Sequence, residues 1–244
     1  MTGDVCAVCG GSGWERSAES GAVRRCRCAD TARLERLLGE ARIPKRYENC
    51  TLESYETKKD NPSLARAKKD VAAFLDKYPI VDFGLLFLGP CGVGKTHLAV
   101  SLLRKLVEER LDRGLFYDFR DLLRAIQLSW NSVSQTSELQ ILGPVLEVDV
   151  LVLDDLGANK PTDWVRETME HIVNCRYNDR KLTIFTSNYL DVPARKGEET
   201  LTDRIGARLR SRLYEMCKVI EIHGEDFRQK IRQAAYRDPD ALSR

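Results

Sequence analysis

A loop suited to binding phosphate lies in the first half of the chain. Residues 89–96 read GPCGVGKT, which matches the pattern G-x-x-x-x-G-K-[ST] and stands between an apolar run and an amphipathic segment. In such a loop the backbone N–H groups wrap a triphosphate, the lysine reaches the β- and γ-phosphates and the hydroxyl ligates Mg²⁺. The pattern therefore predicts that Lys95 binds phosphate and that Thr96 binds Mg²⁺. The other predicted contacts are Gly89, Pro90, Cys91, Gly92, Val93 and Gly94.

Carboxylate and amide side chains follow two later apolar runs. The run VLVL at 150–153 is followed by Asp154 and Asp155, and the run that contains Thr186 and Ser187 is followed by Asn188. Phosphoryl transfer needs a carboxylate for Mg²⁺ and a group that orients the attacking water. We expect Asp154 to hold Mg²⁺ through water, Asp155 to polarise the attacking water and Asn188 to bond the γ-phosphate or that water. The alternatives are solvated aspartates at a strand end and an asparagine that merely favours a turn.

Four of the eight cysteines crowd near the N-terminus. Cys6 and Cys9 form a C-x-x-C pair, and Cys26 and Cys28 form a C-x-C pair. Four thiolates without a nearby histidine suit tetrahedral Zn²⁺ in a closed structural site. Disulfides, an iron–sulfur cluster and free thiols are the alternatives, the first disfavoured in a reducing cytosol. A small basic surface with one stacking aromatic accompanies these cysteines and suits either nucleic acid or solvent: Trp14, Arg16, Arg24, Arg25 and Arg27.

Short apolar runs that alternate with amphipathic segments must position these residues. This alternation predicts an α/β fold with a parallel five-stranded sheet. The expected strands are 84–88, 115–119, 149–153, 182–186 and 219–222. The expected helices of this part are 63–78, 96–111, 121–130, 163–177 and 202–214. A short helix at 31–41 precedes Pro44, so we expect a zinc-binding module with a linker helix at 1–50 and a nucleotide-binding domain at 51–244.

Composition excludes several classes of protein. The 244 residues are 43% hydrophobic and 31% charged, which is too apolar for a disordered chain. No apolar run approaches the roughly 20 residues that span a bilayer, and no secretory signal opens the chain, so we expect a cytoplasmic protein without a membrane partner. The net charge of +2 is too small to predict a nucleic-acid partner by itself.

The sequence resembles the DnaC/IstB branch of the AAA+ ATPases over roughly residues 45–235. The resemblance rests on GPCGVGKTHLA, VLVLDDLG and TIFTSNY, in that order, which correspond to the Walker A, Walker B and sensor 1 motifs of the family. It implies a nucleotide contact at His97 and a sensor 2 residue at Arg228. The segment 203–213 resembles box VII, which implies an arginine finger at Arg212, with Arg208 or Arg210 as alternatives, and self-association through the nucleotide interface. Two departures stand out: Asp155 replaces a common glutamate, which favours slow hydrolysis, and the helical lid is short.

The resemblance implies one principal function and two alternatives. The cysteine module resembles those of DnaI-type loaders, which implies an ATP-dependent loader that binds the replicative DNA helicase and single-stranded DNA. The alternatives are an IstB-type regulator of transposition, which binds duplex DNA and a transposase, and a nucleotide-switched binding module with negligible turnover. In loaders of this family an extra helical element faces DNA, here within 120–142, with Arg120, Arg124, Trp130 and Asn131 as candidate contacts.

Overall fold

A parallel five-stranded sheet forms the centre of the molecule. The computed structural model describes residues 6–16, 21–130, 137–193 and 197–229. Across the sheet the order is β4-β5-β6-β3-β7, and every neighbouring pair is parallel. The strands are β3 (Gly84–Leu88), β4 (Gly114–Asp118), β5 (Val150–Asp154), β6 (Leu182–Ser187) and β7 (Cys217–Glu221). The predicted fold class is confirmed, and each of the five expected strands is present to within two residues at each end.

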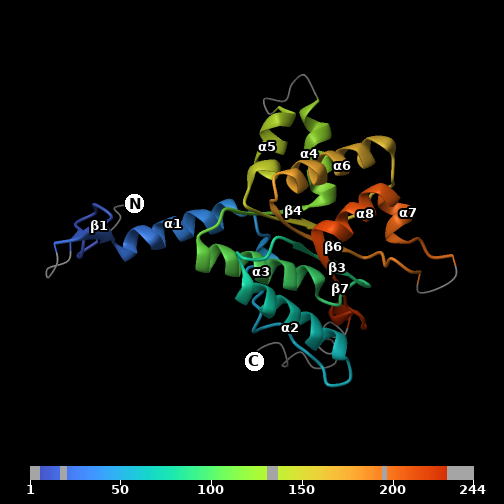
Figure 1. The fold of residues 1–244 in the computed structure, drawn as a ribbon, viewed down its shortest axis with the longest axis horizontal. Helices are drawn as coiled ribbons and strands as arrows, with labels where there is room; N and C mark the ends of the chain where they lie inside the picture. Colours follow the sequence, from blue (N-terminus) through green and yellow to red (C-terminus); the bar gives the residue numbers. More distant parts are fainter. Residues whose placement is uncertain (1–5, 17–20, 131–136, 194–196, 230–244) are drawn as a thin grey trace.

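Helices cover both faces of the sheet (Figure 1). Helices α2 (Pro62–Lys77) and α3 (Lys95–Arg110) pack on one face, against Leu85 and Phe87 of β3. The other face is covered by α4 (Phe119–Ser129), α5 (Glu138–Glu147), α6 (Asp163–Asn178), α7 (Leu201–Ile205) and α8 (Ala207–Met216). Because both faces are covered, β3 and residues 150–153 of β5 are continuous apolar runs that are fully buried.

Several helical features differ from the sequence expectation. The helix expected at 31–41 begins four residues earlier, at Arg27. The expected helix 202–214 is two helices, because Gly206 between α7 and α8 has φ +84°, a backbone conformation outside the helical region. Helix α5 was not expected, since it contains Gly143 and Pro144, which are poor helix formers. A capping box between Ser137 and Gln140 starts α5, and Leu142 and Val145 bury it in the core.

A hairpin and a long helix form what we call the N-terminal arm. The hairpin pairs β1 (Trp14–Arg16) with β2 (Val23–Arg25), and α1 (Arg27–Glu40) follows directly. Figure 1 shows the hairpin and the first half of α1 lying beyond the layers of the sheet and its helices. The sequence did not predict the hairpin, because its three-residue strands are largely exposed and lack the alternation of apolar residues that marks a strand packed on a core.

The second half of α1 joins the arm to the sheet. Leu37 and Ala41 are buried, and the backbone N–H of Phe116 in β4 donates to the carbonyl of Ala41 at 2.8 Å. A short 3₁₀ helix, η1 (Lys45–Tyr47), continues toward α2. The segment 41–50 therefore contacts the sheet domain. The boundary near residue 50 between the zinc-binding module and the nucleotide-binding domain remains a prediction.

Candidate active site and metal centre

The phosphate loop joins β3 to α3 at the carboxyl edge of the sheet. It bends through glycines in the left-handed region, with φ +76° at Gly92 and +94° at Gly94, which caps α3. A Cβ at Gly92 would collide with the side chain of Asp226, and one at Gly94 would collide with the ring of Tyr55. These positions therefore require glycine both for conformation and for space. The N-terminus of α3 points its free N–H groups into the loop, which suits an anion.

Lys95 lies buried inside this loop. Its Nζ donates to the carbonyls of Gly89 at 2.8 Å and Pro90 at 2.7 Å, and to Oδ1 of Asn188 at 2.7 Å. Burial lowers the pKa of Lys95 to about 8, against the opposing effect of nearby acidic groups. A phosphate beside the ammonium would replace these neutral partners with a full counter-charge, so the site fits a polyanion.

Thr96 and Asp154 form a pair of oxygens that suits Mg²⁺. The Thr96 hydroxyl donates to Asp154 Oδ1 at 2.9 Å, and the hydroxyl of Thr186 donates to the same oxygen at 2.6 Å. Asp154 is buried, and this burial raises its pKa although both hydroxyls lower it. A divalent cation would stabilise the charged carboxylate, and hydroxyl and carboxylate oxygens are ligands that Mg²⁺ accepts, so the pair fits the ion. Sequence analysis missed Thr186, which becomes relevant only because β6 lies beside β5.

Asp155 and Asn188 lie next to this pair. Asn188 bridges two groups, since its Oδ1 accepts from Lys95 and its Nδ2 donates to Asp155 Oδ1 at 2.5 Å. Asp155 has φ +60°, and its backbone N–H donates to the Thr186 hydroxyl at 2.9 Å. Its Oδ2 lies 3.3 Å from the guanidinium of Arg120. Burial raises the pKa of Asp155, and the Arg120 charge is the strongest influence that lowers it.

Two adjoining cavities can hold a nucleotide. A cavity of about 350 Å³ is lined by the residues of the candidate site, which include Lys95, Thr96, Asp154, Asp155 and Asn188. Cys91 and Arg228 also line it. The neighbouring cavity of about 550 Å³ shares Gly92, Gly94 and His97 with the first and is lined by residues 54–61 and 223–227. The first suits the phosphates and the second suits the nucleoside. Sequence analysis missed three linker residues that line the phosphate cavity, namely Arg46, Tyr47 and Cys50.

His97 holds the linker against the phosphate loop. Its Nε2 lies 2.8 Å from the carbonyl of Thr51, and its ring meets the edge of Tyr55. Tyr55 in turn donates its hydroxyl hydrogen to the carbonyl of Val93 in the loop at 3.1 Å. His97 lines both cavities, but its ring nitrogen is already engaged by backbone.

The three arginines of α8 differ in their surroundings. Arg212 donates to Asn174 and lies over the ring of Tyr177, with 5.2 Å to the ring centre. Arg210 pairs with Asp191. Arg208 is exposed at the start of α8, and no hydrogen bond or ion pair joins its side chain to the described part of the chain. None of the three lines the phosphate cavity of its own chain.

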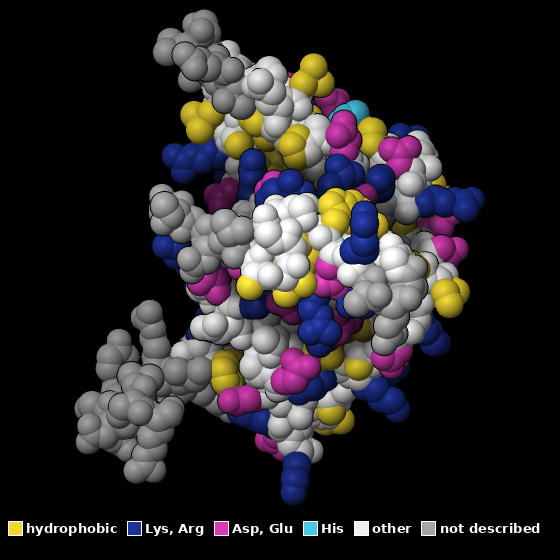
Figure 2. All heavy atoms as spheres, turned by 90° about the vertical axis from the view of Figure 1, so that its left-hand side faces the viewer, with side chains coloured by type: hydrophobic (Ala, Val, Ile, Leu, Met, Phe, Trp, Pro, Cys, Tyr) yellow, Lys and Arg dark blue, Asp and Glu magenta, His cyan; other side chains and the backbone are white. Residues whose placement is uncertain are grey.

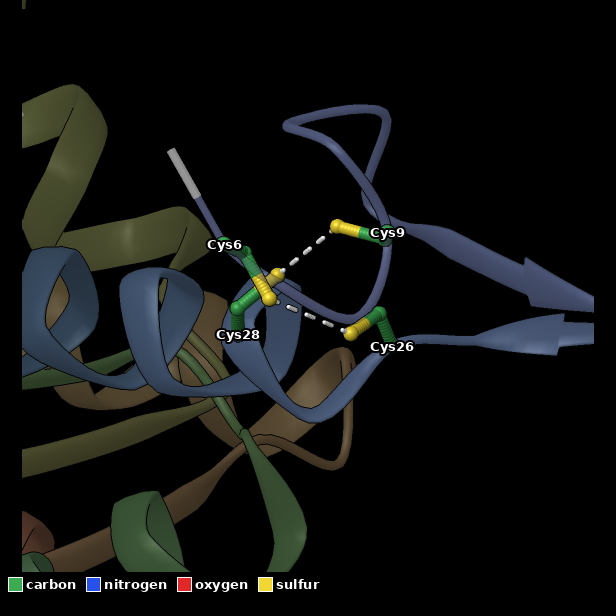
Figure 3. Close-up of side chains that lie close together, drawn as sticks. All are labelled: Cys6, Cys9, Cys26 and Cys28. Carbon is green, nitrogen blue, oxygen red and sulfur yellow. Dashed lines mark hydrogen bonds between the residues drawn. The ribbon is translucent and has the colours of Figure 1, made fainter. Parts of the chain in front are cut away.

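The four N-terminal cysteines converge at the base of the hairpin (Figure 3). Their sulfurs all lie within 4.8 Å of one another, with Cys6 and Cys26 3.8 Å apart and Cys9 and Cys28 3.4 Å apart. A zinc–sulfur length of about 2.3 Å gives a tetrahedron with edges of about 3.8 Å. The donor set and the spacing therefore fit Zn²⁺. Cys26 caps α1 and Cys28 lies in its first turn, so the positive helix end faces the thiolates.

Comparison with known proteins decides the family. A family model described as IstB-like ATP binding protein matches residues 23–235. The chain belongs to the IstB-like ATP-binding protein family. The replicative helicase loader DnaC of Escherichia coli strain K12 is 26% identical over 208 residues, which are 82% of this chain and 78% of the relative.

Solved structures agree with this assignment. The crystal structure of the DnaC helicase loader has a TM-score of 0.64 and 37% identity to this IstB-like protein, over 73% of this chain and 99% of that one. The crystal structure of DnaI matches with a TM-score of 0.59 and 24% identity, which shows the shared fold. The resemblance to DnaC/IstB-like AAA+ ATPases is thus confirmed, and this IstB-like protein is an ATPase. In the described ranges, no helix combines the length and apolar character needed to cross a membrane.

Proposed function

We propose that this protein is an ATP-dependent loader of the replicative DNA helicase. The observation that carries the proposal is the similarity to the DnaC helicase loader, which spans 99% of that chain at 37% identity. The DnaC relative from Escherichia coli supports it over 82% of this chain. The cysteine module adds support, because four thiols ready for Zn²⁺ suit the reducing cytoplasm in which such a loader acts.

Each residue of the phosphate cavity has a separate role in ATP hydrolysis. Lys95 and Arg228 bind the phosphates. Thr96 and Asp154 would hold Mg²⁺, which would supply positive charge to the phosphates. Asp155 accepts a proton from the attacking water, and Asn188 orients that water or the γ-phosphate. An arginine from a neighbouring copy supplies the remaining positive charge.

The tip of the N-terminal arm is the proposed docking surface for the helicase. Val8, Trp14 and Val23 are large apolar residues that are more than half exposed, and Arg25 lies over the Trp14 ring. Exposed apolar side chains beside arginines are typical of protein interfaces. The arm carries them beyond the ATPase layers, where a partner can reach them (Figure 1).

Helix α4 is the proposed contact for single-stranded DNA. Arg120 and Arg124 are exposed on it, and Trp130 follows it with half of its surface exposed. Asn131, the fourth predicted contact, lies outside the described residues. Figure 2 shows Lys and Arg interspersed with Asp and Glu over the side from which the arm projects. The proposal therefore rests on the exposed arginines and on the Trp130 ring, which can stack on a base.

Co-elution with the replicative helicase of the same organism tests the loader function. We expect the full chain with ATP to form a complex, and we expect the double variant Trp14→Ala and Val23→Ala to weaken it by at least about 10-fold. Val192→Ala is the matched control, since Val192 is an exposed apolar residue outside the arm. Failure of the wild-type chain to bind the helicase would reject the loader function.

An IstB-type regulator of transposition is the second candidate, because the matching family model carries that name. This candidate predicts that no helicase complex forms in the co-elution experiment. It predicts instead that the protein, together with a transposase, slows the migration of duplex DNA in a gel.

The arginine finger is expected on α8, and its three arginines can be separated by substitution. Sequence resemblance favours Arg212, but Arg208 is the exposed arginine without a described partner, so we propose Arg208 as the finger. We expect Arg208→Ala to lower turnover at least about 100-fold at protein concentrations that permit self-association, with unchanged ATP affinity. Arg212→Ala and Arg210→Ala are the comparisons, and a selective loss of turnover in either would move the finger there.

A further inference from the structure

The Thr186 side chain connects the ends of two neighbouring strands at the phosphate cavity. Thr186 lies in β6 beside the end of β5 and is only 1% exposed. Its hydroxyl donates to Asp154 Oδ1 at 2.6 Å and accepts the backbone N–H of Asp155 at 2.9 Å. A hydroxyl has a single hydrogen to donate, so these two bonds fix its direction. One buried hydroxyl therefore contacts both of the aspartates to which we assign roles in hydrolysis.

The first bond orients the carboxylate that is proposed to hold Mg²⁺. Thr96 and Thr186 both donate to Asp154 Oδ1, and no other hydrogen bond to this carboxylate occurs in the described ranges. Oδ2 therefore keeps its lone pairs for a ligand in the cavity that Asp154 lines. Of the two donors, Thr186 is the one that is not itself a proposed ligand of the ion. Without its hydroxyl the carboxylate would lose a fixed donor and could rotate more freely.

The second bond holds the backbone that carries the proposed base. Asp155 has φ +60°, in the left-handed region that residues with a Cβ rarely adopt. Such a conformation persists only where the surrounding structure fixes it. The next backbone N–H, that of Leu156, donates to the carbonyl of Thr186 at 2.8 Å, and Ser187 Oγ donates to the carbonyl of Leu156 at 2.7 Å. Thr186 and Ser187 thus fasten residues 154–156 to the end of β6.

We propose that Thr186 is a positioning residue for ATP hydrolysis: its hydroxyl orients the Asp154 carboxylate and holds the left-handed backbone of Asp155. The inference rests on the proposed roles of these two aspartates, and Thr186 acts through them. The hydroxyl, not the shape of the side chain, has this role. Substitution can separate the two, because valine has nearly the shape of threonine without its hydroxyl.

Amide hydrogen exchange in the nucleotide-free full chain tests the bond to Asp155 without turnover. Thr186→Val removes the acceptor of the Asp155 N–H. We expect this amide, followed by nuclear magnetic resonance, to exchange about 10-fold faster in Thr186→Val than in wild type. Thr186→Ser should keep the wild-type rate, because its hydroxyl can make the same bond.

Nucleotide binding and turnover test what the hydroxyl does for hydrolysis. In EDTA, Thr186→Val should bind a fluorescent ATP analogue within about two-fold of wild type, because Lys95 and the phosphate loop are unchanged. We expect its kcat to fall by about 10- to 150-fold, the range for loss of a hydrogen bond to a charged group, with a smaller change in KM. The Mg²⁺ concentration that gives half-maximal turnover should rise about 10-fold. Thr186→Ser should keep wild-type values.

Thr183→Val is the matched control on the same strand. Thr183 is also 1% exposed, and its hydroxyl accepts from Nε of Arg176 at 2.8 Å, outside the phosphate cavity. The control should lose stability but retain the kcat and Mg²⁺ dependence of wild type. Thr186→Ala is a second variant without the hydroxyl and should behave like Thr186→Val. Equal losses of kcat in Thr183→Val and Thr186→Val, or in the serine and valine variants at position 186, would overturn the inference.

Asp154→Asn and Asp155→Asn separate this inference from the roles on which it rests. Each should lower kcat at least as much as Thr186→Val does. If both aspartate variants hydrolyse ATP at the wild-type rate, the proposed roles fail and the inference fails with them. If both are inactive while Thr186→Val and Thr186→Ala are normal, the roles stand and the inference alone is overturned.

Discussion

Lys95→Ala is expected to lower ATP affinity by about 10- to 150-fold, because a hydrogen bond to a charged group contributes roughly 1.5–3 kcal/mol. Lys95 is buried at the start of α3, among carbonyls of the phosphate loop, where a polyphosphate is its natural counter-charge. The substitution also leaves Asn188 Oδ1 without the donor that it has in the structure. Titration with a fluorescent ATP analogue measures the affinity.

The matched control for Lys95 lies on the same helix. Lys105 is half-exposed and pairs with Glu109 at 3.2 Å, far from the phosphate cavity. Lys105→Ala should leave ATP affinity within about two-fold of wild type, since exposed ion pairs contribute little. Equal affinities for Lys95→Ala and Lys105→Ala would contradict the assignment of the phosphate site.

Removal of metal from the cysteine cluster is the second large expected effect. We expect about one zinc ion per chain in protein purified without chelator. Binding of structural zinc contributes on the order of 10 kcal/mol to the folding free energy of a small module. Because Cys26 and Cys28 lie at the start of α1, losing the ion should unfold the hairpin and fray this helix. Hydrogen exchange should then show loss of protection in the hairpin and in the first turns of α1.

Two variants make the zinc experiment specific. Cys9→Ser should lose zinc and arm protection, while ATP binding by the distant phosphate cavity persists. Cys175→Ser is the control, because Cys175 lies on α6 outside the cluster and should keep the full metal content. A metal-free wild-type protein with a protected arm would contradict the zinc site.

Asp155 contacts its neighbours because its backbone adopts an unusual conformation. Its φ of +60° lies in the left-handed region, which aspartate tolerates better than most residues with a Cβ. That conformation places the carboxylate against Asn188 and Arg120. The short side chain therefore contacts the polar groups of the cavity in this structure, although many AAA+ proteins use glutamate at the corresponding position.

Much of the fold followed from local patterns in the sequence. The phosphate loop and the five strands were predictable because their signals lie within a few residues of one another: glycines beside a lysine, and apolar runs bounded by turns. The cysteine spacing likewise predicted four ligands that meet in space, and the structure brings their sulfurs together. Helix α5 was missed because its stability comes from burial of Leu142 and Val145, which overrides the poor helix formers within it.

Only the tertiary structure decided which distant residues meet. Strand β6 lies between β5 and β3, so Asn188 at its end falls between Asp155 and Lys95, and Thr186 reaches Asp154. Arg176 is another case, since it is fully buried and donates to carbonyls of α5 and β6 that no local pattern connects to it. The physical reason is that strand order and helix packing are set by burial of the whole core. Side chains separated by tens of residues become partners only after that burial is complete.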